Sequence, residues 1–447
     1  MVKFDDAVIQ ARLAIIASVL WTFSKTGDAG ARLMSLRPAE DPYPVYAQVR
    51  SQGELVRSRL GIWLTASHPL CQAVLRDPRF GVAPISALTR INLDRRAGTG
   101  DRSIQPVDDS FLTRNPPEHD RLRKLVSPPF MPRALRQRSA MIEQVVGEVL
   151  AEMSERPSFD AIADFAVRVA LNTITRLLGV AEVDQERFVR WGVTLSRSLN
   201  GVRTMAEVRE VRTVLAELEA FFAELIAYRN EHPGDDVVSE LVKSQVDGRP
   251  LDRRDLFATA ELLFVAGFET MVNLVGNAIL ILLADGEARA SLLARPETAD
   301  DIVEEVLRVD SPVQYVARVS TEPLTLAGKR LPRRSTVVLL LGAANRDPAV
   351  FADPDRFDPA RPNNRDHLAF SAGMHYCLGA GLARLQAATM LRELFGRFPD
   401  LAQAGPVQRR PSRNIRGVIG LPVSPGTLSH SALHSGRHFG GNPGGTL

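Results

Sequence analysis

Cysteine and aromatic residues are both scarce in this sequence. Its 447 residues include two cysteines, Cys71 and Cys377, and aromatic residues make up 6% of the chain. Two cysteines so far apart cannot build the disulfide framework of a secreted protein, so we expect a cytoplasmic protein. The low aromatic content also disfavours a base-stacking surface for nucleic acids. The cysteines therefore raise a question of chemistry rather than of covalent cross-linking.

An excess of charge of one sign is also absent. The 55 Lys and Arg residues and the 52 Asp and Glu residues leave a net charge of +3, and the two signs are evenly mixed. This pattern disfavours a nucleic-acid-binding protein. The sequence contains no Gly-x-Gly-x-x-Gly after an expected strand and no cysteine cluster. It therefore carries no signature of a flavin domain or an iron–sulfur cluster, and any electrons that it uses must come from another protein.

The ends of the sequence lack the patterns of a membrane anchor. Residues 7–23 are mostly apolar, but Gln10 and Arg12 interrupt them, whereas a transmembrane helix needs about 18 or more consecutive apolar residues. We expect residues 1–36 to form a helical extension that lies on the protein, with no integral membrane span. Residues 424–447 are rich in Gly, Ser and His and are expected to be a disordered tail.

Most of the sequence between these ends shows helical periodicity. Apolar residues recur every three or four positions with no Gly-, Pro- or Ser-rich linker, so we expect one large domain over residues 37–423. The clearest expected helices are residues 140–152, 206–228, 256–283, 300–309 and 382–398. Strand patterns occur in residues 55–65, with a turn at Gly61, and in residues 323–341, with a turn at Ala327 and Gly328. The expected fold class is mainly α with a smaller β-rich portion.

The strongest functional signal is the segment around Cys377. A glycine-bearing loop leads into Cys377, and an amphipathic helix is expected immediately after it. Backbone amides at a helix N-terminus stabilise a thiolate that precedes them. An isolated cysteine in such a loop would more often be buried and inert. Here the spacing Phe370-x-x-Gly-x-His375-x-Cys377-x-Gly379 resembles the haem-binding signature of the cytochrome P-450 family.

This resemblance implies a cytochrome P-450 fold and haem b (iron protoporphyrin IX) as the cofactor, with Cys377 as the axial ligand of the iron. A thiolate ligand pushes electron density towards bound oxygen and favours O–O cleavage. Phe370 and Gly379 would lie against the haem, and His375 would donate to a propionate. Ser371 departs from the family pattern, which more often has glycine there. Because serine is small, we expect the departure to have little effect.

A second motif lies inside the expected helix 256–283. The segment Ala266-Gly267-Phe-Glu269-Thr270 interrupts an otherwise apolar run. Gly267 costs about 1 kcal/mol relative to Ala in a helix interior, and a buried acid and hydroxyl are expensive unless they are partnered. One interpretation is a packing glycine beside a capped polar pair. The other follows from the family resemblance, because the segment resembles the oxygen-activation motif, with Glu in place of Asp. In that role Thr270 and Glu269 deliver protons to dioxygen.

Further motifs follow in the order that the family has. Glu305 and Arg308 match its Glu-x-x-Arg pair, in which the side chains at positions i and i+3 share one helix face and brace the fold behind the haem. His119 and Arg123 lie one turn apart, and Arg318 follows a short strand pattern. By resemblance these three side chains bind the haem propionates. Each signal taken alone would equally fit ordinary solvated side chains.

The resemblance also implies a reaction. The expected enzyme is a monooxygenase that inserts one oxygen atom from dioxygen into a C–H bond of a hydrophobic small molecule. The electrons would come from NAD(P)H through a ferredoxin reductase and a ferredoxin, since the chain carries no reductase of its own. Expected docking residues for an acidic ferredoxin are Arg121, Lys124, Arg133, Arg136 and Arg384. Expected substrate contacts are Leu263, Ala266, Val313, Val316, Val418 and Ile419.

Two other functions compete with this one. A peroxide-driven haem-thiolate enzyme would need no protons delivered by the protein, so the Glu269–Thr270 pair argues against it. A haem-binding protein without catalysis, such as a sensor, would have no need to retain both Cys377 and Thr270.

Overall fold

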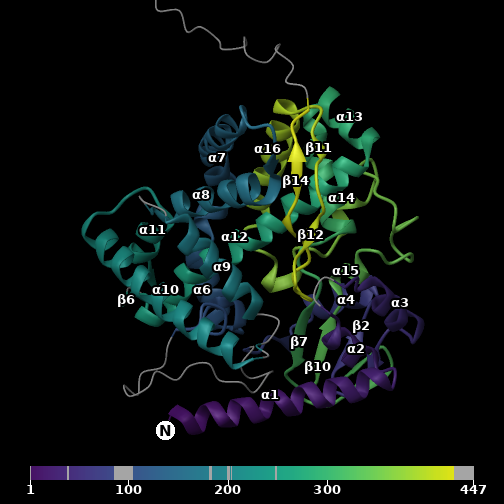
Figure 1. The fold of residues 1–447 in the computed structure, drawn as a ribbon. Helices are drawn as coiled ribbons and strands as arrows, with labels where there is room; N and C mark the ends of the chain where they lie inside the picture. Colours follow the sequence, from purple (N-terminus) through teal and green to yellow (C-terminus); the bar gives the residue numbers. More distant parts are fainter. Residues whose placement is uncertain are drawn as a thin grey trace, which may run out of the picture.

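The computed structural model describes residues 2–37, 40–84, 104–180, 184–198, 202, 204–246 and 249–426. A large helical part and a smaller β-rich part lie side by side (Figure 1). The expected fold class is therefore confirmed.

The helices account for most of the chain. Their bounds are α1 Val2–Lys25, α2 Ala29–Ser35, α3 Tyr43–Ser51, α4 His68–Arg76, α6 Glu118–Val126, α7 Pro132–Met153, α8 Val167–Leu178, α9 Gln185–Ser198, α10 Met205–Glu231, α11 Val237–Lys243, α12 Arg253–Ala284, α13 Gly286–Ala294, α14 Ala299–Val309, α15 Leu341–Ala344 and α16 Ala380–Arg397. All five helices expected from periodicity are present, with ends that differ by a few residues, except that α7 begins eight residues earlier. Within residues 1–36 the structure has the helices α1 and α2.

Helix α12 is the centre of the helical part. It contacts α8, α9, α10, α14 and α16, and nearly all of its side chains from Phe257 to Leu282 are buried. Its surroundings explain its composition, because a helix that is apolar on all sides must be enclosed. Among the residues searched it is the one helix long and apolar enough to span a bilayer, and it is mostly buried inside the protein. It is a core helix.

Local signals fix where several helices begin and end. The Thr204 hydroxyl and Glu207 form a capping box at the start of α10, and the Ser67 hydroxyl accepts a hydrogen bond from the Leu70 amide in α4. Helix α8 ends at Gly179, which has a left-handed φ of +78°. A side chain at Gly179 would also collide with the carboxylate of Asp236, which caps α11.

A five-stranded sheet in the order β1-β2-β10-β7-β3 organises the β-rich part. The strands of the structure are β1 Val56–Arg57, β2 Trp63–Thr65, β3 Phe80–Gly81, β4 Phe159–Asp160, β5 Gln245–Val246, β6 Arg249–Pro250, β7 Val316–Ser320, β8 Leu324–Leu326, β9 Lys329–Leu331, β10 Thr336–Leu339, β11 Ala402–Gln403, β12 Gln408–Arg409, β13 Val418–Gly420 and β14 Pro422–Ser424. The two expected turns are confirmed. Gly61 lies between β1 and β2 with φ +80°, and Ala327 and Gly328 join β8 to β9 with φ +45° and +70°.

The C-terminal end departs slightly from expectation. Ser424 is the last residue of β14, so the ordered chain extends into the predicted tail. Residues 427–447 lie outside the described part of the chain, and the disorder of the tail stays a prediction.

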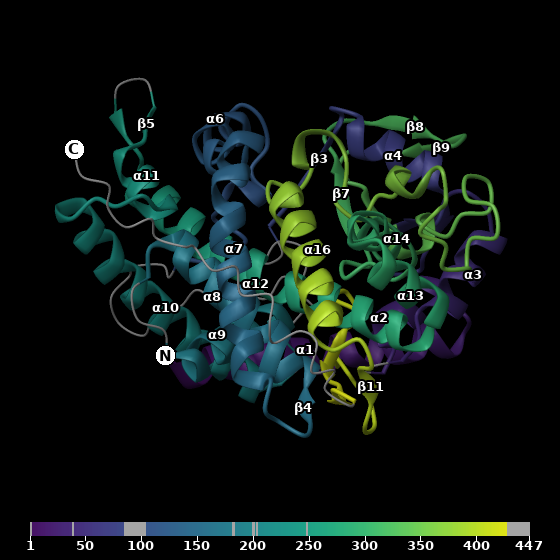
Figure 2. The same cartoon turned by 90° about the horizontal axis from the view of Figure 1, so that it is seen from above.

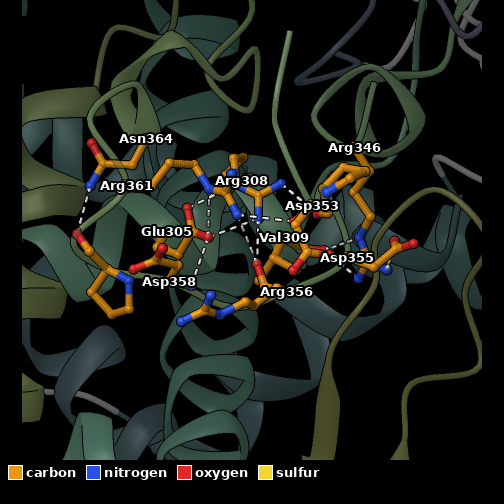
Figure 3. Close-up of polar contacts among 12 residues, drawn as sticks. Glu305, Arg308, Val309, Arg346, Asp353, Asp355, Arg356, Asp358, Arg361 and Asn364 are labelled. Atoms are coloured by element: carbon orange, nitrogen blue, oxygen red, sulfur yellow. Dashed lines mark hydrogen bonds and ion pairs between the residues drawn. The ribbon is translucent and has the colours of Figure 1, made fainter. Parts of the chain in front are cut away.

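A buried ion pair ties α14 to the long loop that follows α15. Both side chains of the Glu305–Arg308 pair are fully buried, and Arg308 donates to the Glu305 carboxylate at 2.7 and 2.8 Å. Arg308 also donates to the carbonyl oxygens of Asn345, Pro354 and Arg356 at 2.7–2.9 Å. Figure 3 shows Glu305 and Arg308 side by side, and Arg361 reaches the Glu305 carboxylate as well, at 3.3 Å. The expectation that this pair braces the fold has a clear physical basis in these contacts.

We expect Arg308→Met to lower the free energy of unfolding by about 3–5 kcal/mol, because it removes the principal charged partner of a buried carboxylate and the donor to three carbonyl oxygens. Chemical denaturation measures this loss. The matched control is Arg365→Met, because Arg365 forms an exposed pair with Asp301 at 3.8 Å and such pairs contribute at most about 1 kcal/mol. Equal stability of the two variants would contradict a bracing role.

Candidate active site

Cys377 lies between a short turn and a long helix. The turn Gly373–His375 precedes it, α16 begins at Ala380, and the Cys377 amide donates to the Phe370 carbonyl at 2.9 Å. The thiol is accessible to solvent. The protein that surrounds it on most sides raises its pKa, while the amide of Gly379 and the charge of Arg123 act in the opposite direction. This cysteine can be reached by a ligand and has groups around it that stabilise a thiolate.

Cys71 has the opposite character. It is fully buried in α4, and its Sγ lies 3.8 Å from the Thr65 carbonyl oxygen. Burial raises the pKa of this thiol far above its usual range. Cys71 therefore behaves as a small buried hydrophobe.

Two residues of the loop before Cys377 adopt left-handed backbone conformations. Gly373 has φ +68°, and a Cβ there would lie on top of the Leu75 carbonyl oxygen. Ser371 has φ +63°, a region that costs a non-glycine residue roughly 1–2 kcal/mol. The departure from glycine at position 371 is therefore not neutral for the backbone. The Ser371 hydroxyl does gain one contact, since it accepts from Arg318 at 3.4 Å.

Four basic side chains gather beside Cys377. His119 and Arg123 come from α6, Arg318 from β7 and His375 from the cysteine loop, and the rings of the two histidines are 4.3 Å apart. The Nε2 atoms of both histidines are buried with no hydrogen-bond partner in the described part of the chain. Burial, together with the neighbouring positive charges, lowers the pKa of His375 to about 3, and burial lowers that of Arg318 to about 10.

Such a cluster is poised for a negatively charged ligand. Buried donors without acceptors are costly, and among the residues that the structure describes the carboxylate bonded to the cluster is Asp120, 2.9 Å from His119 Nδ1. An anionic group placed between these side chains would satisfy the orphaned Nε2 atoms and relieve the repulsion. The residues present therefore fit a cofactor that carries carboxylates and lies against an accessible cysteine, as haem does.

A second network holds the helix that follows Cys377. Glu304 of α14 forms an ion pair with Arg384 of α16 and lies 3.1 Å from His367 Nε2. Arg384 also stacks on the Phe370 ring at 4.6 Å and donates to the Tyr376 hydroxyl at 3.1 Å. Burial alone would raise the pKa of Glu304, but the hydrogen bonds from His367 and Arg384 outweigh it and hold the pKa at about 2.

Helix α12 turns one accessible strip away from the core. Ala266, Gly267 and Thr270 are accessible, whereas Val265, which precedes them, and Phe268, which follows Gly267, are buried. The Thr270 hydroxyl donates to the Ala266 carbonyl oxygen at 2.7 Å. Thr270 is thus a hydroxyl presented on an open helix face.

Glu269 points away from this strip. Its carboxylate is buried and forms an ion pair with Arg410, which precedes β13 in the chain. Arg410 also donates to Asn273 Oδ1 at 2.9 Å, and Asn273 donates to the Glu269 carbonyl oxygen at 2.7 Å. Sequence reasoning missed Arg410 and Asn273. The signal available was that a buried acid requires a partner, but nothing in the sequence says which arginine supplies it.

Comparisons with known proteins agree with this geometry. A family model described as "Cytochrome P450" matches residues 291–428. A protein named cytochrome P450 140 from Mycobacterium tuberculosis is 39% identical over 90% of this chain and 93% of its own. The monooxygenase PikC of Streptomyces venezuelae is 34% identical over 86% of this chain and 91% of its own. A crystal structure of P450BioI superimposes with a TM-score of 0.78 at 33% identity, covering 86% of this chain and 98% of that one.

The chain belongs to the cytochrome P450 family. It is therefore a haem-dependent monooxygenase, and its fold is the cytochrome P450 fold. The expectations about family, fold and enzyme class are confirmed.

The predicted substrate contacts of this cytochrome P450 differ in exposure and in the direction that they face. Ala266 lies on the accessible strip of α12, next to the largely buried Leu263. Val418 is fully buried and packs against Gly276, while Ile419 is 38% exposed. Neighbouring residues of a strand face opposite sides, so Val418 and Ile419 cannot line the same surface.

The contacts expected after α14 have a more consistent arrangement. Val316 shares a face of β7 with Arg318, because the two are two residues apart in one strand. Its side chain therefore points to the side on which the basic cluster lies. Val313 is half-buried and forms a bridge with Ile415.

The predicted docking residues fall into two groups. Arg121 pairs with Asp255 at 3.0 Å, and Arg384 is engaged with buried Glu304. Lys124, Arg133 and Arg136 are exposed on α6 and α7. Figure 2 shows α7 beside α16, the helix that follows Cys377. These three residues are available for a partner on the cysteine side of the molecule.

We expect Glu304→Gln to remove a pH-dependent part of the stability. A carboxyl whose pKa is about 2 folded and 4.5 in its ordinary state stabilises the fold by about 3 kcal/mol above pH 4.5, and this is lost as the pH falls towards 2. Chemical denaturation at pH 7, 5, 4 and 3 should show a shallower decline for the variant than for the parent protein. Glu148→Gln is the control, because its pair with Arg176 is exposed. Parallel declines in Glu304→Gln and the parent would show that the network is not charged.

Proposed function

We propose that the protein hydroxylates a C–H bond of a hydrophobic small molecule, with haem b bound through Cys377 and electrons supplied by a ferredoxin. The observation that carries this proposal is an accessible cysteine beside a buried basic cluster whose histidine Nε2 atoms have no acceptor among the described residues. When bound, the haem supplies the activation of dioxygen by a thiolate-ligated iron.

Each residue near Cys377 has a distinct part in holding the cofactor. His119, Arg123, Arg318 and His375 would bind the propionates, which places four donors around two carboxylates. Arg123 already donates to the Tyr376 carbonyl oxygen at 2.7 Å, so it links the propionate side to the cysteine loop. By family analogy, Phe370 and Gly379 lie against the macrocycle. Glycine at 379 leaves the approach open, since a Cβ there meets no atom within 4 Å.

The residues of α12 would supply protons. Thr270 presents its hydroxyl on the accessible strip, and Glu269 precedes it in the chain. Arg410, the ion-pair partner of Glu269, lines a solvent-open pocket together with Gln314, Arg413 and Gly417. Water in this pocket would thus lie next to the ion pair that holds Glu269. General acid catalysis of this kind contributes about 10²–10⁴-fold to a rate.

The substrate should be apolar and enter beside α12. Leu263, Ala266, Val313 and Val316 would contribute apolar contacts, with one of Val418 and Ile419. P450BioI was crystallised with hexadec-9Z-enoic acid ligated to acyl carrier protein, which is a ligand of this general character. At 33% sequence identity, this relative supports a hydrophobic substrate for the chain, and it supports no specific compound.

Electrons would come from NAD(P)H through a ferredoxin reductase and a ferredoxin in the cytoplasm. The chain has no flavin or iron–sulfur signature, and Lys124, Arg133 and Arg136 offer an exposed basic surface to an acidic partner. A peroxide-driven enzyme would not need Thr270 to deliver protons. A sensor without catalysis would have no use for the hydroxyl on the accessible strip.

We expect Cys377→Ala to abolish the thiolate band in the spectrum of the reduced protein with carbon monoxide, because no other described side chain offers a soft anionic ligand there. Cys71→Ala is the matched control and should keep the band, since Cys71 is fully buried in α4. A band lost in Cys71→Ala and kept in Cys377→Ala would overturn the assignment.

Thr270→Ala should uncouple electron use from product formation. The variant retains the haem, but it loses the hydroxyl that orders the proton path, so product per NAD(P)H should fall by about tenfold or more. Measuring NAD(P)H consumed, product formed and hydrogen peroxide released decides this. Thr270→Ser keeps the hydroxyl and should stay coupled. Unchanged coupling in Thr270→Ala would leave Thr270 as a helix-bending residue only.

The rate of first reduction by ferredoxin should fall as salt rises, because charges more than about 8–10 Å apart are largely screened at 0.15 M. Lys124→Glu and Arg136→Glu should slow this reduction without changing substrate-induced spectra. Lys329→Glu, in the β8–β9 hairpin, serves as the control. Stopped-flow reduction measures all three. If neither salt nor charge reversal changes the rate of first reduction, the docking surface lies elsewhere.

A further inference from the structure

Helix α1 carries an unusual concentration of exposed apolar side chains. Four of the ten large hydrophobic residues exposed in the described part of the chain lie in it: Ile15 at 63%, Ile16 at 38%, Val19 at 39% and Trp21 at 64%. The other six are scattered over different helices, strands and loops. Scattered apolar residues are normal on a protein surface, whereas a contiguous patch marks an interaction site.

The helix is attached to the protein along one side only. Ile9 and Leu13 are buried and belong to the main hydrophobic core, and α1 contacts α2 and α10. In Figure 1 it runs along the lower edge of the molecule. The outer side of a surface helix normally carries charged residues, but the outer side of α1 has none over residues 13–24. Between Arg12 and Lys25 the sequence Leu-Ala-Ile-Ile-Ala-Ser-Val-Leu-Trp-Thr-Phe-Ser contains no charged residue.

Basic residues cluster at the C-terminal end of this apolar surface. Lys25 is exposed at the last turn of α1, and Arg32 and Arg59 are exposed next to it. Arg59 donates to the Thr26 hydroxyl at 3.0 Å, which fixes it at the helix end. The nearby acid, Asp28, is already occupied by hydrogen bonds from Ser58 and from backbone amides of Ala31 and Arg59. The end of the helix therefore presents positive charge.

These features select a lipid surface rather than a second protein. A helix that lies in a bilayer interface needs an apolar side, an aromatic residue at headgroup depth and basic residues for anionic headgroups. Helix α1 has all three, with Trp21 one turn before Lys25. A dimer contact needs about 800 Å² from each partner, whereas four side chains on one helix cover roughly half of that, taking about 150 Å² for a tryptophan and less for the rest.

We propose that α1 holds the protein on the surface of an anionic bilayer, lying in the interface without crossing it. The apolar side between Arg12 and Lys25 enters the headgroup region, and Lys25, Arg32 and Arg59 contact the phosphates. This inference does not depend on the proposed substrate or on the ferredoxin. It gives the N-terminal extension a role of its own, separate from the haem site.

Vesicle binding of the full-length haem-loaded protein tests the proposal. The protein should cosediment with phosphatidylcholine vesicles that contain one quarter phosphatidylglycerol, and more weakly with phosphatidylcholine alone. The triple substitution Ile15→Ser, Val19→Ser, Trp21→Ser should weaken this binding at least tenfold. The control Leu293→Ser removes an equally exposed apolar side chain from α13, 38% accessible, and should change nothing. Retained haem spectra show that each variant is folded.

Trp21 also provides a direct optical readout. The two other tryptophans, Trp63 and Trp191, are buried at 9% and 0% exposure, so vesicles should shift the emission of Trp21 alone to the blue. Trp21→Phe should still bind and should lose this shift. Lys25→Glu with Arg59→Glu should weaken binding to the anionic vesicles and leave binding to phosphatidylcholine unchanged.

Three results would overturn the proposal. The first is no cosedimentation of the parent protein beyond that of the triple variant. The second is equal binding to both vesicle types, which would show that anionic headgroups do not contribute to binding. The third is self-association of the parent protein in sedimentation velocity without lipid, abolished by the triple variant, which would mean that a second copy of the chain covers α1.

Discussion

The arrangement of the site depends on two adjacent carboxylates of α14. Glu305 is paired with Arg308 inside the protein and ties α14 to the loop of residues 345–361. Glu304 reaches the other way, to His367 and to Arg384 of α16. The chain segment that contains Cys377 is therefore held at both ends by one helix. Because charges taken out of water are costly unless they are paired, each of these contacts fixes a single geometry.

The basic cluster brings together His119, Arg123, Arg318 and His375 from three parts of the chain. Burial, together with the neighbouring positive charges, lowers the pKa of His375, and burial lowers the pKa of Arg318. In the proposed site a bound carboxylate would give these buried donors an acceptor, so cofactor binding would also stabilise the folded protein.

Local patterns in the sequence predicted many of the helices and turns, but they did not predict which distant strands pair. Apolar periodicity located α7, α10, α12, α14 and α16, and glycine located the turns at Gly61 and Gly328. The parallel pairing of β10 with β2, with Val337 opposite Trp63, leaves no local signal, because the strands are far apart in the chain. The left-handed conformation of Ser371 was equally hidden, since serine itself does not predict it.

The site residues divide in the same way. Cys377, His375 and Thr270 were identified from motifs whose spacing is local. Arg410 could not be identified, because its partner Glu269 lies on α12 and only the folded chain brings them together. Alternation along β13 separates Val418 from Ile419, a distinction that a sequence motif does not make without the strand register.

The segment that joins β12 to β13 couples two properties that are usually engineered separately. It carries Arg410, which pairs with Glu269, and it ends at Gly417, which lies beside Asn273 of α12, just before Val418, which packs on Gly276. If β13 and Glu269 have the roles proposed above, mutations in this segment would act on substrate contact and on proton supply together. Libraries built here would therefore have to be screened for product pattern and for product formed per NAD(P)H at the same time.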